Sequence, residues 1–160
     1  MIIRHASPDD VIELCKLLNE IIRVGGTTAI ETPLSHQEFK GYFLSGADHI
    51  CCFVAENGVG MLMGFQALEN HDGLPENCAD ITTFVKHGST KSGVGSILFN
   101  STIRHAAQLG IDSINATIRQ DNTSGIAYYS KMGFTDHSIT KNIPLLDGTL
   151  VDRVSKRYTV

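Results

Sequence analysis

The run Thr90-Lys91-Ser92-Gly93-Val94-Gly95-Ser96-Ile97-Leu98 stands between a strand-like segment at residues 79–85 and a helical pattern that continues to Leu109. Glycines let a backbone approach a ligand closely, and the first turn of a helix offers unpaired N–H groups and a partial positive charge. Such a turn binds phosphate with backbone groups rather than with lysines. The run therefore predicts a phosphate-binding site formed by Thr90, Lys91, Ser92, Gly93, Val94, Gly95 and Ser96.

Two familiar phosphate motifs do not fit this run. A P-loop requires Lys and Ser or Thr after its last glycine, and Val94 and Gly95 occupy these places after Gly93. A dinucleotide fingerprint requires a third Gly or Ala where this sequence has Leu98. The bound phosphate is therefore expected to belong to another kind of ligand.

The composition is that of a single globular domain spanning residues 1–160, with 42% hydrophobic and 19% charged residues. The net charge of −4 comes without a basic stripe, so we expect no nucleic-acid partner. The longest apolar stretches, such as residues 50–55, are too short to span a bilayer, and no secretory signal is visible. We therefore expect a cytoplasmic protein with no membrane association.

The cysteines and histidines predict no special chemistry. The four cysteines lack C-x-x-C spacing, and we interpret them as reduced core residues. The seven histidines are scattered without paired spacing, so no metal site is expected.

Periodicity and turn signals predict strands interleaved with helices. The expected strands lie at 2–5, 49–56, 59–68, 79–86, 113–118, 134–146 and 149–158, and the expected helices at 8–24, 35–44, 93–109 and 122–132. Asn57-Gly58 and Asp147-Gly148 are predicted two-residue hairpin turns. This order implies an α/β fold in which a mixed seven-stranded sheet is flanked by about four helices.

A second run, residues 121–134, completes a resemblance to a known family. Asn122, Tyr129, Lys131, Gly133 and Phe134 match the pattern N-x-x-[SA]-x-x-x-Y-x-K-x-G-F. Together with the phosphate run and the order of elements, this run resembles the GNAT superfamily of acetyl-CoA-dependent N-acetyltransferases. The phosphate run departs at its first position, where Thr90 replaces the usual Gln or Arg and Lys91 follows.

A narrower resemblance comes from residues 27–33, Thr-Thr-Ala-Ile-Glu-Thr-Pro. They are similar to the T-A-x-F-E-T-x-P segment of the phosphinothricin and L-amino-acid acetyltransferase branch, with Ile30 in place of the aromatic residue. The branch implies a homodimer that acetylates small molecules with an α-amino group. It implies substrate contacts from Thr28 and Glu31, although Glu31 fits a surface-loop acid equally well.

The superfamily resemblance also implies roles for individual residues. Asp80 aligns with a glutamate on the fourth strand of the phosphinothricin branch and is the candidate general base, directly or through a water molecule; alternatively it is a solvated acid at a strand start. Tyr129 is the candidate general acid that protonates the coenzyme A thiolate. The backbone at Phe84 and Val85 would bind the pantetheine arm and stabilise the thioester oxygen. Further cofactor contacts are implied for Asn122, which alternatively caps the helix that follows it, and for Lys131, which alternatively is only solvated. The motif register selects Tyr129 over its neighbour Tyr128, which we interpret as core packing.

The resulting prediction is acetyl transfer from acetyl-CoA to the primary amine of a small molecule, an amino acid or an analogue such as phosphinothricin, by direct attack in a ternary complex. Arg153 and Lys156 on the last strand are candidates for binding a substrate carboxylate, or are exposed edge charges. Two alternatives remain at this point, N-terminal acetylation of peptides or proteins and a non-catalytic acyl-CoA sensor.

Overall fold

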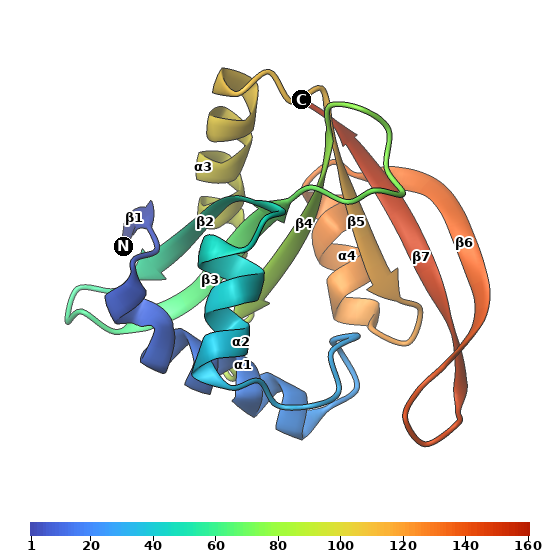
Figure 1. The fold of residues 1–160 in the computed structure, drawn as a ribbon, viewed down its shortest axis with the longest axis horizontal. Coiled ribbons are helices and arrows are strands. Elements are labelled where there is room, and N and C mark those ends of the chain that lie inside the picture. Colours follow the sequence, from blue (N-terminus) through green and yellow to red (C-terminus); the bar gives the residue numbers. More distant parts are fainter.

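The computed structural model describes residues 1–160 and contains one mixed sheet of seven strands with helices on both faces (Figure 1). The strands are β1 (Ile2–His5), β2 (His49–Glu56), β3 (Leu62–Glu69), β4 (Cys78–Val85), β5 (Ser113–Arg119), β6 (Thr135–Pro144) and β7 (Leu150–Thr159). The helices are α1 (Val11–Val24), α2 (His36–Lys40), α3 (Val94–Gln108) and α4 (Thr123–Lys131), with a 3₁₀ turn at Pro8–Asp10 and a π-helical turn at Gly41–Ser45. The predicted α/β fold with seven strands and four helices is confirmed.

The spatial order of the strands is β1-β2-β3-β4-β5-β7-β6. Only β4 and β5 run parallel, and every other neighbouring pair is antiparallel. The parallel pair arises because α3 carries the chain back over the sheet between these two strands, as a parallel connection requires.

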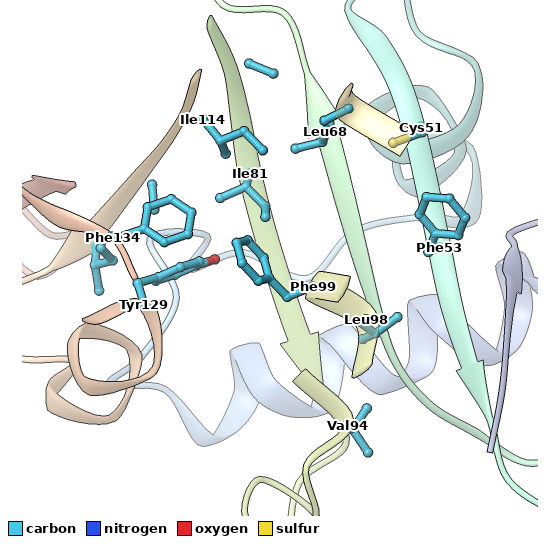
Figure 2. Close-up of a cluster of buried hydrophobic side chains, with 14 of the residues drawn as sticks. Cys51, Phe53, Leu68, Ile81, Val94, Leu98, Phe99, Ile114, Tyr129 and Phe134 are labelled. Carbon is cyan, nitrogen blue, oxygen red and sulfur yellow. The ribbon is translucent and has the colours of Figure 1, made fainter. Parts of the chain in front are cut away.

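Each face of the sheet has its own hydrophobic core. One core lies under α3 and α4 and includes Leu68, Ile81, Leu98, Ile114 and Tyr129 (Figure 2). The other lies under α1 and α2 and is rich in aromatic side chains, among them Phe39, Phe43, Phe65 and Phe84. Because strand side chains alternate between faces, the odd-numbered residues of β4 face the first core and the even-numbered residues face the second. None of the helices has the length and apolar character needed to cross a membrane.

Both predicted hairpin turns and one predicted helix differ from the structure. Between β6 and β7, the N–H of Leu145 donates to the carbonyl of Thr149 (2.8 Å), so the loop spans residues 146–148 instead of being a two-residue turn at Asp147-Gly148. The β2–β3 turn is not a two-residue turn at Asn57-Gly58 but a loop from Asn57 to Met61, because the Asn57 side chain accepts hydrogen bonds from the N–H groups of Val59 (3.1 Å) and Met61 (2.9 Å). The helix expected at 35–44 is α-helical only in α2, where Ser35 and Glu38 form a capping box, and it continues as the π-helical turn.

Gly64 in β3 is placed where a side chain cannot fit. An added Cβ would lie 2.7 Å from the carbonyl oxygen of Phe84 and 3.2 Å from a methyl carbon of Val94. Gly64 therefore lets β3 lie close to the end of β4 and to the first residue of α3.

We expect Gly64→Ala to lower the free energy of unfolding by about 1–3 kcal/mol, because the methyl group meets backbone atoms that cannot move independently. Urea denaturation measures the change. Gly58→Ala is the matched control, since an added Cβ there meets nothing within 4 Å, and its stability should be unchanged or slightly higher. Equal stabilities for the two variants would contradict this account of Gly64.

Candidate active site

The site begins where the parallel strands part. β4 pairs with β5 at only three positions, from Cys78 opposite Ser113 to Asp80 opposite Asn115. Beyond them β4 stays paired with β3 as far as Val85, and β5 stays paired with β7 as far as Arg119. Figure 1 shows β4 and β5 diverging below this point. One edge of β4, from Ile81 to Val85, therefore has no strand beside it.

The hydrogen bonds at the two ends of β4 show which of its backbone groups face the open edge. Lys86 donates its N–H to Met63 of the β3 side (2.8 Å), whereas the carbonyl of Asn77 accepts from Asp112 on the β5 side (2.9 Å). Since the two directions alternate along an antiparallel strand, Thr83 and Val85 present N–H and C=O groups to the opening. Val85 therefore has the free backbone groups that the sequence predicted. The N–H and C=O groups of Phe84 face β3 instead. Thr83, which was not among the predicted residues, has its backbone groups at the open edge.

The predicted phosphate-binding turn lies just after this open edge. Gly93 precedes α3 with a left-handed backbone (φ +82°), which favours glycine. The N–H groups of Val94, Gly95 and Ser96 have no acceptor within the chain, and the first helical hydrogen bond to Gly93 comes from Ile97 (3.1 Å). The turn thus leaves a row of amide donors unpaired at the positive end of a helix, an arrangement suited to a phosphate group. Thr90, Lys91 and Ser92 form the exposed loop that leads into it.

The second glycine of the turn has a different structural reason. A Cβ on Gly95 would lie 2.7 Å from a ring carbon of Tyr128 on α4. The Tyr128 hydroxyl donates to the Gly95 carbonyl oxygen (2.8 Å). Gly95 therefore lets α4 pack against the first turn of α3 and fixes that turn in place.

Helix α4 brings Tyr129 to the open edge of β4. The helix begins at Asn122, whose side chain accepts the N–H of Gly125 (3.0 Å), so the capping alternative for Asn122 is the one observed. Tyr129 is 7% exposed, and its hydroxyl lies 2.9 Å from Thr83 Oγ1. Figure 2 shows this side chain reaching from α4 toward β4. Burial raises the pKa of the Tyr129 phenol, so the hydroxyl keeps its proton at neutral pH.

Asp80 lies where β4 and β5 begin to separate, on the α1/α2 face of the sheet. Asn115 Nδ2 donates to Asp80 Oδ1 (2.9 Å), and Glu69 is the neighbour across the β3 pairing. Burial raises the pKa of the Asp80 carboxyl, while the Asn115 hydrogen bond and the charges of His71 and Arg157 partly oppose the shift. A carboxylate with a raised pKa at the edge of an opening is a suitable proton acceptor.

Asn115, which the sequence analysis did not select, connects Asp80 to β7. The residue is 2% exposed, and its Oδ1 accepts from Ser155 Oγ (2.9 Å) and from Arg157 Nε (2.8 Å). Its Nδ2 also reaches Thr117 Oγ1 (3.0 Å). All the hydrogen-bonding capacity of the Asn115 side chain is used, so Asp80 is held in a fixed orientation. A polar residue inside a predicted strand was the only sequence signal for it.

Hydrogen bonds to β5 and to the β6–β7 turn hold the loop at residues 27–33 over the face of the sheet that contains Asp80. The Thr28 carbonyl accepts from Arg119 (3.2 Å), and the Thr28 hydroxyl accepts from the N–H of Ile30 (3.1 Å). Glu31 Oε2 accepts the N–H of Leu146 in the β6–β7 turn (3.0 Å). In the structure the Thr28 carbonyl, the Thr28 hydroxyl oxygen and Glu31 Oε2 therefore hold the loop in place.

The remaining predicted cations lie in different environments. Lys156 faces the α3/α4 side, is buried, and pairs with Asp136 (2.6 Å), so it is not on the face that contains Asp80. Arg153 shares the Asp80 face through strand alternation, and its Nε is buried without a hydrogen-bond partner. Lys131 is exposed in the last turn of α4.

Comparison with known proteins identifies the class. The profile of the Acetyltransferase (GNAT) family matches residues 14–134, and the chain belongs to this family. It is accordingly an N-acetyltransferase that uses acetyl-CoA.

Individual relatives cover nearly all of the chain. The Bacillus subtilis (strain 168) protein YwnH, named provisionally as a phosphinothricin acetyltransferase, is 25% identical over 95% of this chain and 94% of its own. The Sinorhizobium meliloti phosphinothricin acetyltransferase Pat, solved with AcCoA, has a TM-score of 0.87 at 18% identity, covering 99% of this chain and 88% of that one. A Brucella melitensis ribosomal-protein-alanine N-acetyltransferase also has a TM-score of 0.87 at 18% identity, with both chains covered fully (100%). The two structures show the shared fold.

We expect Gly95→Ala to weaken binding of coenzyme A about tenfold, because the methyl group and the Tyr128 ring would overlap and the first turn of α3 would shift away from α4. Titration calorimetry with free coenzyme A measures the dissociation constant. In the double variant Gly95→Ala/Tyr128→Leu the smaller side chain makes room for the methyl group, and part of the affinity should return. Wild-type affinity in Gly95→Ala would show that this contact does not shape the turn.

Proposed function

We propose that this protein transfers the acetyl group of acetyl-CoA to the primary amine of an amino acid or an amino-acid analogue such as phosphinothricin, by direct attack in a ternary complex. The observation that carries the proposal is the opening between β4 and β5, with Asp80 and Tyr129 reaching it from opposite faces of the sheet. Such an opening lets an extended thioester be approached by a base on one side and an acid on the other.

The residues around the opening fit the parts of acetyl-CoA. The free N–H groups of Val94, Gly95 and Ser96 suit the pyrophosphate, with Thr90 to Gly93 as the flanking loop. The open edge at Thr83 and Val85 suits the pantetheine arm, whose amides pair with it like an added strand. When bound, acetyl-CoA supplies the activated acetyl thioester. Lys131 and the side-chain amide of Asn122 are proposed as further contacts, to a phosphate and to the pantetheine.

The catalytic roles follow from protonation states. An alkyl amine has a pKa of roughly 10 and must lose a proton before it attacks. Asp80, an ionisable acid at the opening, takes that proton, directly or through a water molecule. A free N–H of the β4 edge donates to the thioester oxygen as charge develops on it. Tyr129 gives its phenolic proton to the departing sulfur.

The acceptor is proposed to lie on the face that contains Asp80. Arg153 and Arg157 belong to this face, and Arg119, their neighbour on β5, already pairs with Asp121 (2.6 Å). The unpartnered Nε of Arg153 is proposed to bind an acidic group of the acceptor. The names given to YwnH and Pat, of which that of YwnH is provisional, both refer to phosphinothricin acetylation and agree with an acidic amino-acid-like acceptor.

The hydrogen bond between the loop at residues 27–33 and the β6–β7 turn favours a small acceptor over a peptide. An enzyme for peptide N-termini needs an open groove between residues 27–33 and the β6–β7 hairpin. The Glu31–Leu146 hydrogen bond bridges these two segments. Thr28 and Glu31 are therefore proposed to enclose the acceptor rather than to bind its amine, and the bridged groove is the reason to prefer free amino acids.

We further propose that residues 1–160 act as one domain, that the protein works as a homodimer, and that it resides in the cytoplasm. The dimer proposal rests on the likeness to the phosphinothricin branch, and a purely monomeric sedimentation profile would overturn it. The location agrees with the four free and buried cysteines.

A panel of amines, read by the thiol released from acetyl-CoA, tests the function. We expect turnover with acidic amino acids or phosphinothricin and little with short peptides, because the bridged groove limits acceptor length. Arg153→Ala should raise KM for the accepted compound without changing KM for acetyl-CoA. Saturable coenzyme A binding with no acetylation of any amine would favour an acyl-CoA sensor.

We expect Asp80→Asn and Tyr129→Phe each to lower turnover by about 10²-fold or more, the usual loss for an acid or base group. Asp72→Asn and Tyr42→Phe are matched controls at exposed positions and should keep wild-type rates. Since Asp80 acts as a base and its pKa is raised, the rate should fall as the pH decreases through that raised pKa. This acid limb lies at higher pH than for an ordinary aspartate. An acid limb that persists unchanged in Asp80→Asn would remove Asp80 from this role.

A further inference from the structure

A continuous chain of hydrogen bonds links the phosphate-binding turn to Tyr129. The Gly95 carbonyl oxygen accepts from Tyr128 Oη (2.8 Å), and Gln66 Nε2 donates to the same Tyr128 oxygen (3.1 Å). Gln66 Nε2 also donates to Thr83 Oγ1 (2.9 Å), which lies 2.9 Å from Tyr129 Oη. The chain joins α3, α4, β3 and β4, and Gln66 at its centre is fully buried.

The Gly95 carbonyl fixes the direction of the first half of this chain. A carbonyl oxygen only accepts, so the single hydroxyl proton of Tyr128 lies on the bond to Gly95. Tyr128 Oη must then accept from Gln66, and the amide nitrogen is the only Gln66 atom that can donate. The opposite amide orientation would place two acceptors against each other. This constraint explains why Gln66 keeps its orientation although Oε1 is buried without a partner.

The same amide fixes the direction of the second half. Its other N–H donates to Thr83 Oγ1, which then has its own proton left to give. Tyr129 Oη lies at hydrogen-bond distance from that hydroxyl (2.9 Å) and can accept this proton. If Thr83 donates, the Tyr129 oxygen is an acceptor in this bond, and its proton points away from Thr83. Since the Thr83 backbone faces the open edge of β4, the free direction at Tyr129 is the opening.

We propose that Gln66 and Thr83 are positioning residues that orient the Tyr129 hydroxyl so that its proton faces the sulfur of acetyl-CoA. This inference rests on the proposed role of Tyr129 as the acid. The side chains of Gln66 and Thr83 touch no reacting atom and act through Tyr129. Because this series of hydrogen bonds starts at Gly95, it connects the orientation of the Tyr129 hydroxyl to the turn proposed to bind phosphate.

The proton balance of the step is complete without another reactant. The carbon–sulfur bond breaks, the sulfur takes the electron pair, and the Tyr129 proton moves to it. The Thr83 hydroxyl then donates to the phenolate that remains and stabilises it. The attacking nitrogen forms the new carbon–nitrogen bond and loses two protons in going from ammonium to amide. Asp80 takes the first before the attack and passes it to solvent, and the second, released after the attack, replaces the one given by Tyr129.

A double-mutant cycle tests the inference. Thr83→Val keeps the shape and removes the hydroxyl, and we expect kcat to fall about tenfold or more with KM for acetyl-CoA within about twofold. Thr83→Ser restores the hydroxyl and should restore the rate. In a Tyr129→Phe background Thr83→Val should have no further effect, because Thr83 acts only through that phenol. Gln66→Met should behave like Thr83→Val.

A spectroscopic readout separates orientation from a merely structural role. The C–O stretch of Tyr129 is isolated in the free enzyme by ring-labelled tyrosine and by subtraction of the Tyr129→Phe spectrum. Accepting a hydrogen bond lowers this frequency, and donating the phenolic proton raises it. We expect Thr83→Val to raise the frequency, since the phenol oxygen loses the hydrogen bond that it accepts from Thr83.

The outcomes distinguish the two proposals. A fall in frequency would show that Tyr129 donates to Thr83 and would overturn the inference. Wild-type turnover in Thr83→Val together with slow turnover in Tyr129→Phe would overturn it too, while leaving the proposed function intact. Wild-type turnover in Tyr129→Phe would remove the acid and the inference together.

Discussion

The short pairing of β4 with β5 is the constraint on which the site depends. The pairing covers three positions and ends at Asp80 and Asn115. A buried backbone needs partners for its N–H and C=O groups, so an edge left open inside a sheet is suited to pair with an extended ligand. Where β4 and β5 separate, side chains from the α1/α2 face and from the α3/α4 face of the sheet both lie beside the opening. In the proposed mechanism, cofactor binding and catalysis therefore use the same break in the sheet.

Alternation along β4 distributes the chemistry around this break. Asp80 and Thr83 are three residues apart and therefore point to opposite faces. The Asp80 face holds a hydrogen-bonded network through Asn115 and Arg157 to β7, whereas the Thr83 face holds the network through Gln66 to the two tyrosines. Each network orients one titratable group, and both are largely buried, where unsatisfied polar groups are costly.

Local sequence signals predicted those parts of the site that are made by neighbouring residues. The strand-to-helix run predicted the amide donors at Val94 to Ser96, because the glycines and the helix start lie within one turn. The Asn122 cap and the position of Tyr129 on α4 followed from a single motif. The turn after β2 was missed because the Asn57 side chain, rather than a two-residue turn, determines its shape.

The residues that orient the catalytic groups could not be predicted in this way. Gln66 is 17 positions from its partner Thr83 and 62 positions from its partner Tyr128. Asn115 is 35 positions from Asp80. A polar residue in a strand gives no sign of its partner until the strand order and register are known. The hydrogen bond between Glu31 and the β6–β7 turn, 115 positions away, likewise depends on the fold.

The sequence by itself determined the family, the layered α/β fold and the phosphate-binding turn, because periodicity, caps and glycine positions act over a few residues. Tertiary structure alone decided which backbone edge is open, which partners surround Asp80 and Glu31, and in which direction the hydroxyl groups of Tyr128 and Thr83 donate. These properties depend on the register between strands, since a shift of one residue would turn every side chain to the other face.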